Sequence, residues 1–232
     1  MKEHPEMPNT HTSLKISSDI KLRFPRLRVL TCRITHVEVR KQDAKLEKFK
    51  NELVSNVKEQ YNLDSLKDVA SFRAYRDFFW RVGVDPTKNR PATEALIRRI
   101  LHGETLPRIN TLVDAYNLAS IKTEIALAAF GADKLKTNLI MRLAETGEEF
   151  IGIGMSKPMI LQGEEIVISD EEKLVAIYPH RDAEHTKVTE KTRHVLLLIC
   201  GVPGISEEVL RNAACVAIEF ITRFCGGEGI IE

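Results

Sequence analysis

Apolar residues recur at helical spacing in five stretches of the chain, and this periodicity predicts five amphipathic helices. The clearest stretch is 42–61, whose apolar stripe lies among Lys and Glu residues and consists of Leu46, Phe49, Leu53, Val57 and Tyr61. Further helices are expected at 69–82, 91–102 and 109–118. The last helix is expected to begin after Ser206, whose hydroxyl suits an N-cap, and to end at Gly226 and Gly227.

Segments rich in β-branched residues predict the strands. Apolar and polar positions alternate over 29–39, which indicates a strand with one buried face, and 195–199 is apolar throughout, as in a fully buried strand. Hairpins are expected at 139–153 and at 165–178. The Ala-rich stretch 121–130 fits a helix or a buried strand equally well. These elements predict an α+β fold with a mixed sheet and packed helices.

Composition adds the expected class of protein. A hydrophobic content of 43% with 34 basic and 33 acidic residues is typical of a soluble globular protein. The chain of 232 residues is expected to form a single compact domain over 13–232, after a disordered tail at 1–12. No apolar run approaches a membrane span, and we expect a cytoplasmic protein with no membrane partner, free cysteines and no cofactor.

The expected helix at 109–118 carries polar residues among its apolar positions. Asn110, Asp114 and Asn117 are four and three residues apart, a spacing that places side chains on one face of a helix. One interpretation is that they make capping and turn hydrogen bonds inside a core. The other is that they form the wall of a polar pocket and bind a substrate.

A second concentration of polar side chains lies in the expected loop at 178–192. His180, Asp182 and Thr186 belong to it, and we predict that they take part in substrate binding. The spacing of the histidines and Asp182 matches no strong metal signature, so no metal site is expected. No serine or cysteine motif accompanies the histidines, and no catalytic residue is assigned on this basis.

The net charge of +1 conceals an uneven distribution. Residues 1–110 hold 22 basic and 14 acidic residues, whereas residues 111–232 hold 12 and 19. A basic surface in the first half would suit contact with phosphates, and the predicted RNA-binding residues are Arg73, Arg76, Arg98 and Arg99. Alternatively, the two halves interleave and their charges cancel, and the Arg side chains pack over apolar helix faces.

Four segments, in matching order, resemble the B3/B4 domain of the phenylalanyl-tRNA synthetase β subunit. They are PRINTLVDAYNLAS (107–120), IMRLAETGEEF (140–150), TKVTEKTRHVLLLICGV (186–202) and AIEFITRFCGGEG (217–229). The resemblance covers roughly 70–230. It implies a free-standing copy of that domain, because the rest of a synthetase is missing from the sequence.

In bacterial synthetases the resembling domain hydrolyses the ester between a wrong amino acid and its tRNA, without a side-chain nucleophile. The resemblance therefore implies that tRNA or aminoacyl-tRNA is the partner, or else a free amino acid. This chain departs from the family at two editing positions, where Ala128 replaces a His and Leu198 replaces a Glu. Two hypotheses remain, a deacylase with a rebuilt pocket and a module that binds without cleaving. The first requires the helix at 109–118 and the loop at 178–192 to meet at one site.

Overall fold

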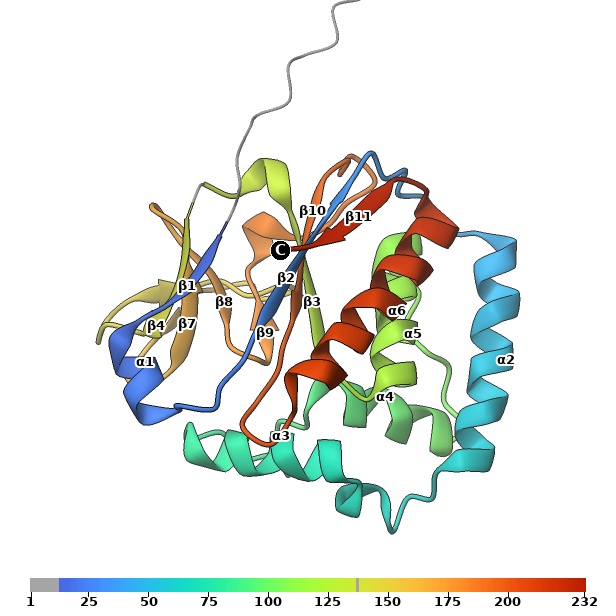
Figure 1. Ribbon diagram of the computed structural model, residues 1–232, viewed down its shortest axis with the longest axis horizontal. Helices are drawn as coiled ribbons and strands as arrows, with labels where there is room; N and C mark the ends of the chain where they lie inside the picture. The colour runs from blue at the N-terminus through green and yellow to red at the C-terminus, as the bar shows by residue number, and fades with distance from the viewer. Residues whose placement is uncertain (1–12, 137) are drawn as a thin grey trace, which may run out of the picture.

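The computed structural model describes residues 13–136 and 138–232. The expected tail at 1–12 lies outside these residues. The described chain is compact and is built in three layers, with helices over one face of a central sheet and a second sheet beyond its other face (Figure 1). The fold class is α+β, as predicted. None of the described helices is long and apolar enough to cross a membrane.

The five predicted helices all form, and a sixth, short one precedes them. The α-helices are α1 (Ser18–Arg23), α2 (Ala44–Gln60), α3 (Ala70–Arg81), α4 (Ala92–Leu101), α5 (Thr111–Thr123) and α6 (Glu207–Cys225). Short 3-10 helices are η1 (Leu66–Asp68), η2 (Ala132–Lys134) and η3 (Glu184–Thr186). Ser206 caps α6 as expected, since its hydroxyl accepts a hydrogen bond from the Val209 N–H at 3.4 Å.

The central sheet has the strand order β11-β2-β10-β3 and is antiparallel throughout. Its strands are β2 (Leu30–Thr35), β3 (Leu127–Gly131), β10 (Val195–Ile199) and β11 (Glu228–Ile231). The stretch 121–130 is therefore neither wholly helix nor wholly strand, because α5 ends at Thr123 and β3 begins at Leu127. Helices α5 and α6 pack on each other and cover one face of this sheet (Figure 1).

The outer sheet has the order β1-β4-β7-β8-β9 and is mixed, because β1 runs parallel to β4 and the other pairs are antiparallel. Its strands are β1 (Leu14–Ile16), β4 (Leu139–Leu143), β7 (Ile166–Ser169), β8 (Leu174–Ile177) and β9 (Arg181–Asp182). A two-stranded ribbon joins β5 (Glu149–Phe150) to β6 (Met159–Ile160). The predicted hairpin at 165–178 forms, as β7 and β8.

The predicted hairpin at 139–153 is wrong. Strand β4 pairs with β1 and β7, and β5 pairs with β6 instead of with β4. Strand β4 pairs with strands that are distant in the sequence, and Met141 between them is completely buried. The local alternation of apolar and polar residues does not reveal which distant strand will be the partner.

The main core extends from the helices through the central sheet to one face of the outer sheet. It includes Ile166 and Ile168 of β7, whereas Val167 of the same strand belongs to a smaller second core. Because successive side chains of a strand point to opposite faces, the second core lies on the far face of the outer sheet. The ribbon of β5 and β6 contributes Phe150 to that core.

Candidate functional site

The amino end of α5 is held by the polar residues that the sequence singled out. Asn110 is the N-cap, and its side-chain oxygen accepts a hydrogen bond from the Val113 N–H at 3.0 Å. Its amide nitrogen donates to the carbonyl of Val188 at 3.5 Å, which ties α5 to the segment after η3. The capping interpretation therefore describes Asn110, and its part in substrate binding stays a prediction.

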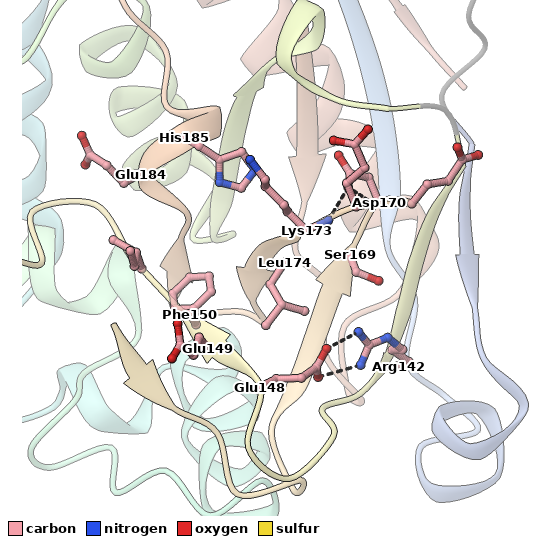
Figure 2. A pocket seen from close by; sticks show the side chains of 13 residues that line it. Arg142, Glu148, Glu149, Phe150, Ser169, Asp170, Lys173, Leu174, Glu184 and His185 are labelled. Carbon is pink, nitrogen blue, oxygen red and sulfur yellow. Dashed lines mark hydrogen bonds and ion pairs between the residues drawn. The ribbon is translucent and has the colours of Figure 1, made fainter. Parts of the chain in front are cut away.

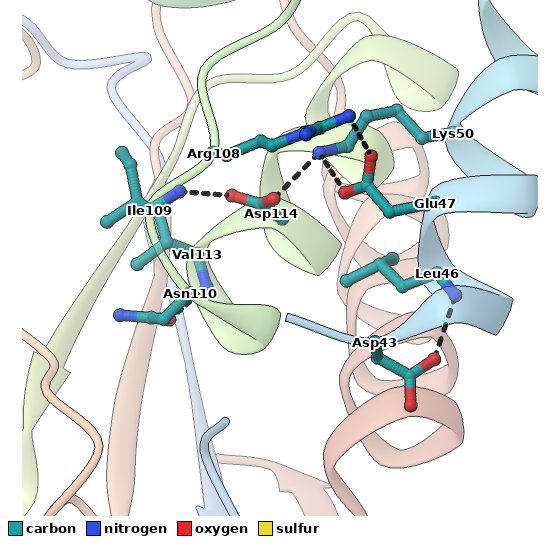
Figure 3. A network of polar contacts seen from close by, with 9 residues as sticks. All are labelled: Asp43, Leu46, Glu47, Lys50, Arg108, Ile109, Asn110, Val113 and Asp114. Atoms are coloured by element: carbon teal, nitrogen blue, oxygen red, sulfur yellow. Dashed lines mark hydrogen bonds and ion pairs between the residues drawn. The ribbon is translucent and has the colours of Figure 1, made fainter. Parts of the chain in front are cut away.

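Asp114 is a buried charge with a buried partner (Figure 3). Its carboxylate accepts hydrogen bonds from the Lys50 ammonium of α2 at 2.7 Å and from the Ile109 N–H at 3.0 Å. The Lys50 ammonium also pairs with Glu47 at 3.0 Å, and Glu47 pairs with Arg108 at 3.0 Å. Each carboxylate oxygen of Asp114 thus accepts a hydrogen bond, and the side chain joins α5 to α2. A role of Asp114 in substrate binding also stays a prediction.

Asn117 does not share a site with the other two residues. It lines a cavity of about 490 Å³ beside α4, which we call the basic pocket. The basic pocket is lined by Lys88, Arg90, Ala92, Ala95, Leu96, Arg98, Arg99, His102, Glu104 and Asn117. The expected common face fails because Asn110 precedes the helix, where helical spacing does not apply, and because Asp114 turns toward α2.

The four arginines predicted to bind RNA all make ion pairs within the chain. Arg76 of α3 and Arg98 of α4 share the carboxylate of Glu94, which is 0% exposed, at 3.1 and 2.8 Å. Arg73 pairs with Asp68 at 3.3 Å, and Arg99 pairs with Glu104 at 3.0 Å. Arg76 and Arg98 thus fasten α3 to α4, whereas Arg98 and Arg99 also line the basic pocket. RNA binding by any of the four stays a prediction.

The segment expected to be one loop, 178–192, contains strand β9 and helix η3. Asp182 lies in β9 at the edge of the outer sheet, where its backbone pairs with Ala176. Among the described residues no hydrogen bond or ion pair reaches its carboxylate. Burial raises the pKa of Asp182 from 3.8 to about 7.

Tyr116 and Cys200 border this carboxyl group. Burial raises the pKa of the Tyr116 hydroxyl, and the charges of Asp182, Cys200 and Asp114 raise it further. Burial also raises the pKa of the Cys200 thiol, and the charge of Asp182 raises it further. Tyr116 of α5, Asp182 of β9 and Cys200 after β10 therefore lie within electrostatic range of one another. The segment 178–192 contacts the start of α5 where Asn110 donates to the Val188 carbonyl, but the basic pocket that Asn117 lines includes no residue of this segment.

Of the other two predicted residues of this segment, Thr186 is buried and His180 is half-buried. The His180 ring packs against Phe79, with ring centroids 6.0 Å apart, and its Nδ1 is buried without a hydrogen-bond partner among the described residues. Burial, assisted by the charge of Arg181, lowers the pKa of His180 to about 4, so the ring is neutral at pH 7. Thr186 is 0% exposed, and its hydroxyl donates to the carbonyl of Ala183 at 3.3 Å. A substrate contact by either residue stays a prediction.

Two positions where the resembling family has a His and a Glu are direct neighbours. Ala128 of β3 and Leu198 of β10 are cross-strand partners in the central sheet, and both are buried. Cys200 follows β10 directly, two residues after Leu198, and the charge of Asp182 influences its thiol, so the replaced pair and the Asp182 carboxyl lie in the same region of the structure. Of the titratable groups described around Tyr116, only Asp182 has a pKa raised to near 7.

The B3/4 domain family matches residues 74–226, which is more than half of the chain. The chain belongs to the B3/4 domain family. Its relatives include the phenylalanine–tRNA ligase beta subunit of Bartonella henselae, 29% identical over 161 residues that make up 60% of this chain and 20% of that protein. The beta subunit of Yersinia pestis is 32% identical over 108 residues, 47% of this chain and 14% of that protein.

A solved structure gives the same picture of the fold. The structure is an N-terminal fragment of the phenylalanyl-tRNA synthetase beta subunit from Pyrococcus horikoshii, which matches 95% of this chain and 50% of that fragment. The TM-score is 0.52 at 14% identity, so this similarity concerns the fold alone. The B3/4 chain spans about a fifth of the length of its relative from Bartonella henselae.

Sequence reasoning missed Tyr116 and Cys200 as neighbours of the site. Tyr116 fits the apolar series of its helix, and Cys200 follows an apolar strand, so both resemble ordinary core residues. No local signal distinguishes them. Their proximity to Asp182 arises only when β9, β10 and α5 are brought together.

Proposed function

We propose that this B3/4 chain hydrolyses the ester bond of mischarged aminoacyl-tRNA in trans, in the cytoplasm, with Asp182 as the general base. The observation that carries the proposal is the half-buried Asp182 carboxyl, which has no hydrogen-bond or ion-pair partner in the described chain and whose pKa is raised by burial to about 7. A base is most effective when its pKa lies near the working pH, because it is then both available and strong enough to accept a proton.

The proposed reaction needs no side-chain nucleophile. The Asp182 carboxylate accepts a proton from a water molecule as the water oxygen attacks the ester carbonyl. The bond between the carbonyl carbon and the ribose oxygen then breaks, and the ribose oxygen takes the proton back from Asp182. The products are the free amino acid and the uncharged tRNA, and Asp182 returns to its starting state.

Release of amino acid from a panel of misacylated tRNAs tests this proposal. We expect the wild-type chain to release at least one amino acid above the rate in buffer, and Asp182→Asn to lose at least about 100-fold of that rate, the usual size of a general-base contribution. The matched control is Glu190→Gln, which neutralises an exposed carboxylate in the same segment. Release equal to the buffer rate for every tRNA would refute the activity.

A second function, binding of tRNA without hydrolysis, is favoured by the basic pocket and by the loss of the His and Glu positions at Ala128 and Leu198. Arg90 and His102 line the pocket with no ion-pair partner among the described residues. They are therefore available to a phosphate, unlike Arg98 and Arg99, whose charges are already paired.

Filter binding of tRNA at several salt concentrations measures this second function. Each phosphate contact contributes about one unit to the slope of log affinity against log salt. We expect Arg90→Ala to reduce the slope by about one unit and to weaken binding, whereas Arg26→Ala, an exposed arginine outside the pocket, leaves the slope unchanged. Equal slopes for the wild type and Arg90→Ala would exclude the pocket as a phosphate site.

A further inference from the structure

A cavity of about 580 Å³ opens on the far face of the outer sheet (Figure 2). Its lining includes Phe150 and Leu174, which belong to the second core. Val167 of β7 also belongs to that core, whereas its neighbours Ile166 and Ile168 point into the main core. The cavity and the Tyr116–Asp182 site therefore lie on different faces of the outer sheet.

The lining of this cavity, which we call the acidic pocket, is negative. Six carboxylates contribute, from Glu148, Glu149, Asp170, Glu171, Glu172 and Glu184. Arg142 and Lys173 are the cations among the lining residues, and Lys136 and Lys187 pair with Glu172 and Glu184 at its edge, so two negative charges remain in excess. His185 does not alter this balance near pH 7, because burial and the nearby Lys173 lower its pKa.

Several of these charges are already used by the fold. Glu148 forms a bidentate ion pair with Arg142, with distances of 2.6 and 2.9 Å (Figure 2). Asp170 accepts backbone N–H groups of Lys136, Glu172 and Lys173, with Lys136 at 3.1 Å. Glu149 has no ion pair among the described residues. An incoming cation would therefore meet one uncommitted carboxylate and the field of the others.

Ser169 supplies an independent indication of a ligand. The residue is only 7% exposed and lines the acidic pocket, and its hydroxyl oxygen, which is not fully enclosed, has no hydrogen-bond partner in the described part of the chain. The register of β7 against β8 shifts between Ile168 and Ser169, an irregularity that re-aims the side chain beside it.

The floor of the acidic pocket is apolar. Phe150 is 1% exposed and Leu174 is 9% exposed, and both line the cavity. Figure 2 shows their side chains between the Arg142–Glu148 ion pair and the ring of His185. The cavity thus combines a negative rim, an unpartnered hydroxyl and an apolar floor, a combination that suits a cation with a hydrocarbon stem.

We propose that the acidic pocket binds a small organic cation of the alkylammonium class. The ammonium group donates to the Ser169 hydroxyl and lies in the negative field of the rim, and the hydrocarbon stem covers Ile151 and the exposed edge of Leu174. This site is independent of the proposed ester hydrolysis, because it lies on the other face of the outer sheet and uses none of the same residues.

Isothermal titration of the full chain with cadaverine tests the proposal. We expect saturable 1:1 binding of cadaverine, a dication, and of n-pentylamine, which has the same stem and one charge. Ammonium chloride, which has one charge and no stem, should bind at least tenfold more weakly than n-pentylamine. Ser169→Ala and Glu149→Gln should each weaken cadaverine binding about tenfold. Glu164→Gln, which removes an exposed carboxylate outside the pocket, should leave it unchanged.

Circular dichroism establishes whether each variant is folded. If Ser169→Ala does not fold, the binding measurement on Glu149→Gln decides the test. A parallel titration with Nα-acetyl-lysine amide shows the source of the ammonium, since binding of that probe and not of cadaverine assigns the pocket to a lysine side chain of a peptide. Absence of saturable binding for both probes, or equal affinities of cadaverine for the wild type and the two pocket variants, would overturn the proposal.

Discussion

Asp114→Ala is expected to lower the free energy of unfolding by about 3–5 kcal/mol, the usual effect of removing one partner of a buried ion pair. The Asp114 and Lys50 side chains are only 6% and 7% exposed, and they are 2.7 Å apart. The substitution leaves the Lys50 ammonium in a poorly solvated place, with Glu47 as its one remaining carboxylate partner. Urea unfolding followed by circular dichroism measures the change.

Two further variants separate the buried charge from a general effect of substitution. Replacing both members, in Asp114→Ala with Lys50→Met, should recover most of the loss, because no unpaired charge is then buried. Glu207→Ala breaks the exposed pair with Arg211 and should cost less than about 1 kcal/mol. A loss below about 1 kcal/mol for Asp114→Ala alone would show that the pair does not stabilise the contact of α2 with α5.

Asp182→Asn is expected to make the protein more stable at pH 8 and nearly unchanged in stability at about pH 4. The pKa of Asp182 is raised by burial from 3.8 to about 7, so the folded protein holds a proton that the unfolded chain loses between these values. Folding stability from this group therefore falls as pH rises through that window. At about 1.4 kcal/mol for each pKa unit, the effect is on the order of 4 kcal/mol at most, because Asp182 is half-buried and keeps some contact with water.

The comparison uses urea unfolding of the wild type and the variant at about pH 4, 6 and 8. The expected result is a stability difference that grows with pH and levels off above about pH 7, and the difference between the two proteins removes the contributions of other titrating groups. Glu190→Gln serves as the control, because its carboxylate is exposed. A difference that stays constant over the range would mean that the carboxyl of Asp182 is not withdrawn from water.

Local patterns located the helices well because their determinants are local. Helix α2 has a continuous apolar stripe and is capped by Asp43, whose carboxylate accepts a hydrogen bond from the Leu46 N–H at 2.9 Å. The carboxyl end of α5 has no Gly or Asn that would mark it in the sequence. Glu124 adopts a positive φ of 62° there, a conformation usually taken by Gly or Asn. Tyr61 and Ser71, which are distant in sequence, hold its carboxylate at 2.5 Å each.

The candidate site was predicted less well because it depends on contacts between distant segments. The substrate-binding role of Asp182 stays a prediction, and the expectation that Asn117 lies beside it is wrong, because Asn117 lines the basic pocket, which Asp182 does not. The groups within electrostatic range of Tyr116 come from separate elements, so no local pattern identifies them.

The most direct test of the central proposal is the pH dependence of ester hydrolysis. The rate of amino acid release from a susceptible misacylated tRNA is measured from about pH 5 to 9 and corrected for release in buffer alone. We predict that the wild-type rate rises with pH and levels off above about pH 7, as the Asp182 carboxyl loses its proton, and that Asp182→Asn shows no such rise. A corrected rate that is equal in the two proteins at every pH would contradict the role of Asp182 as the base.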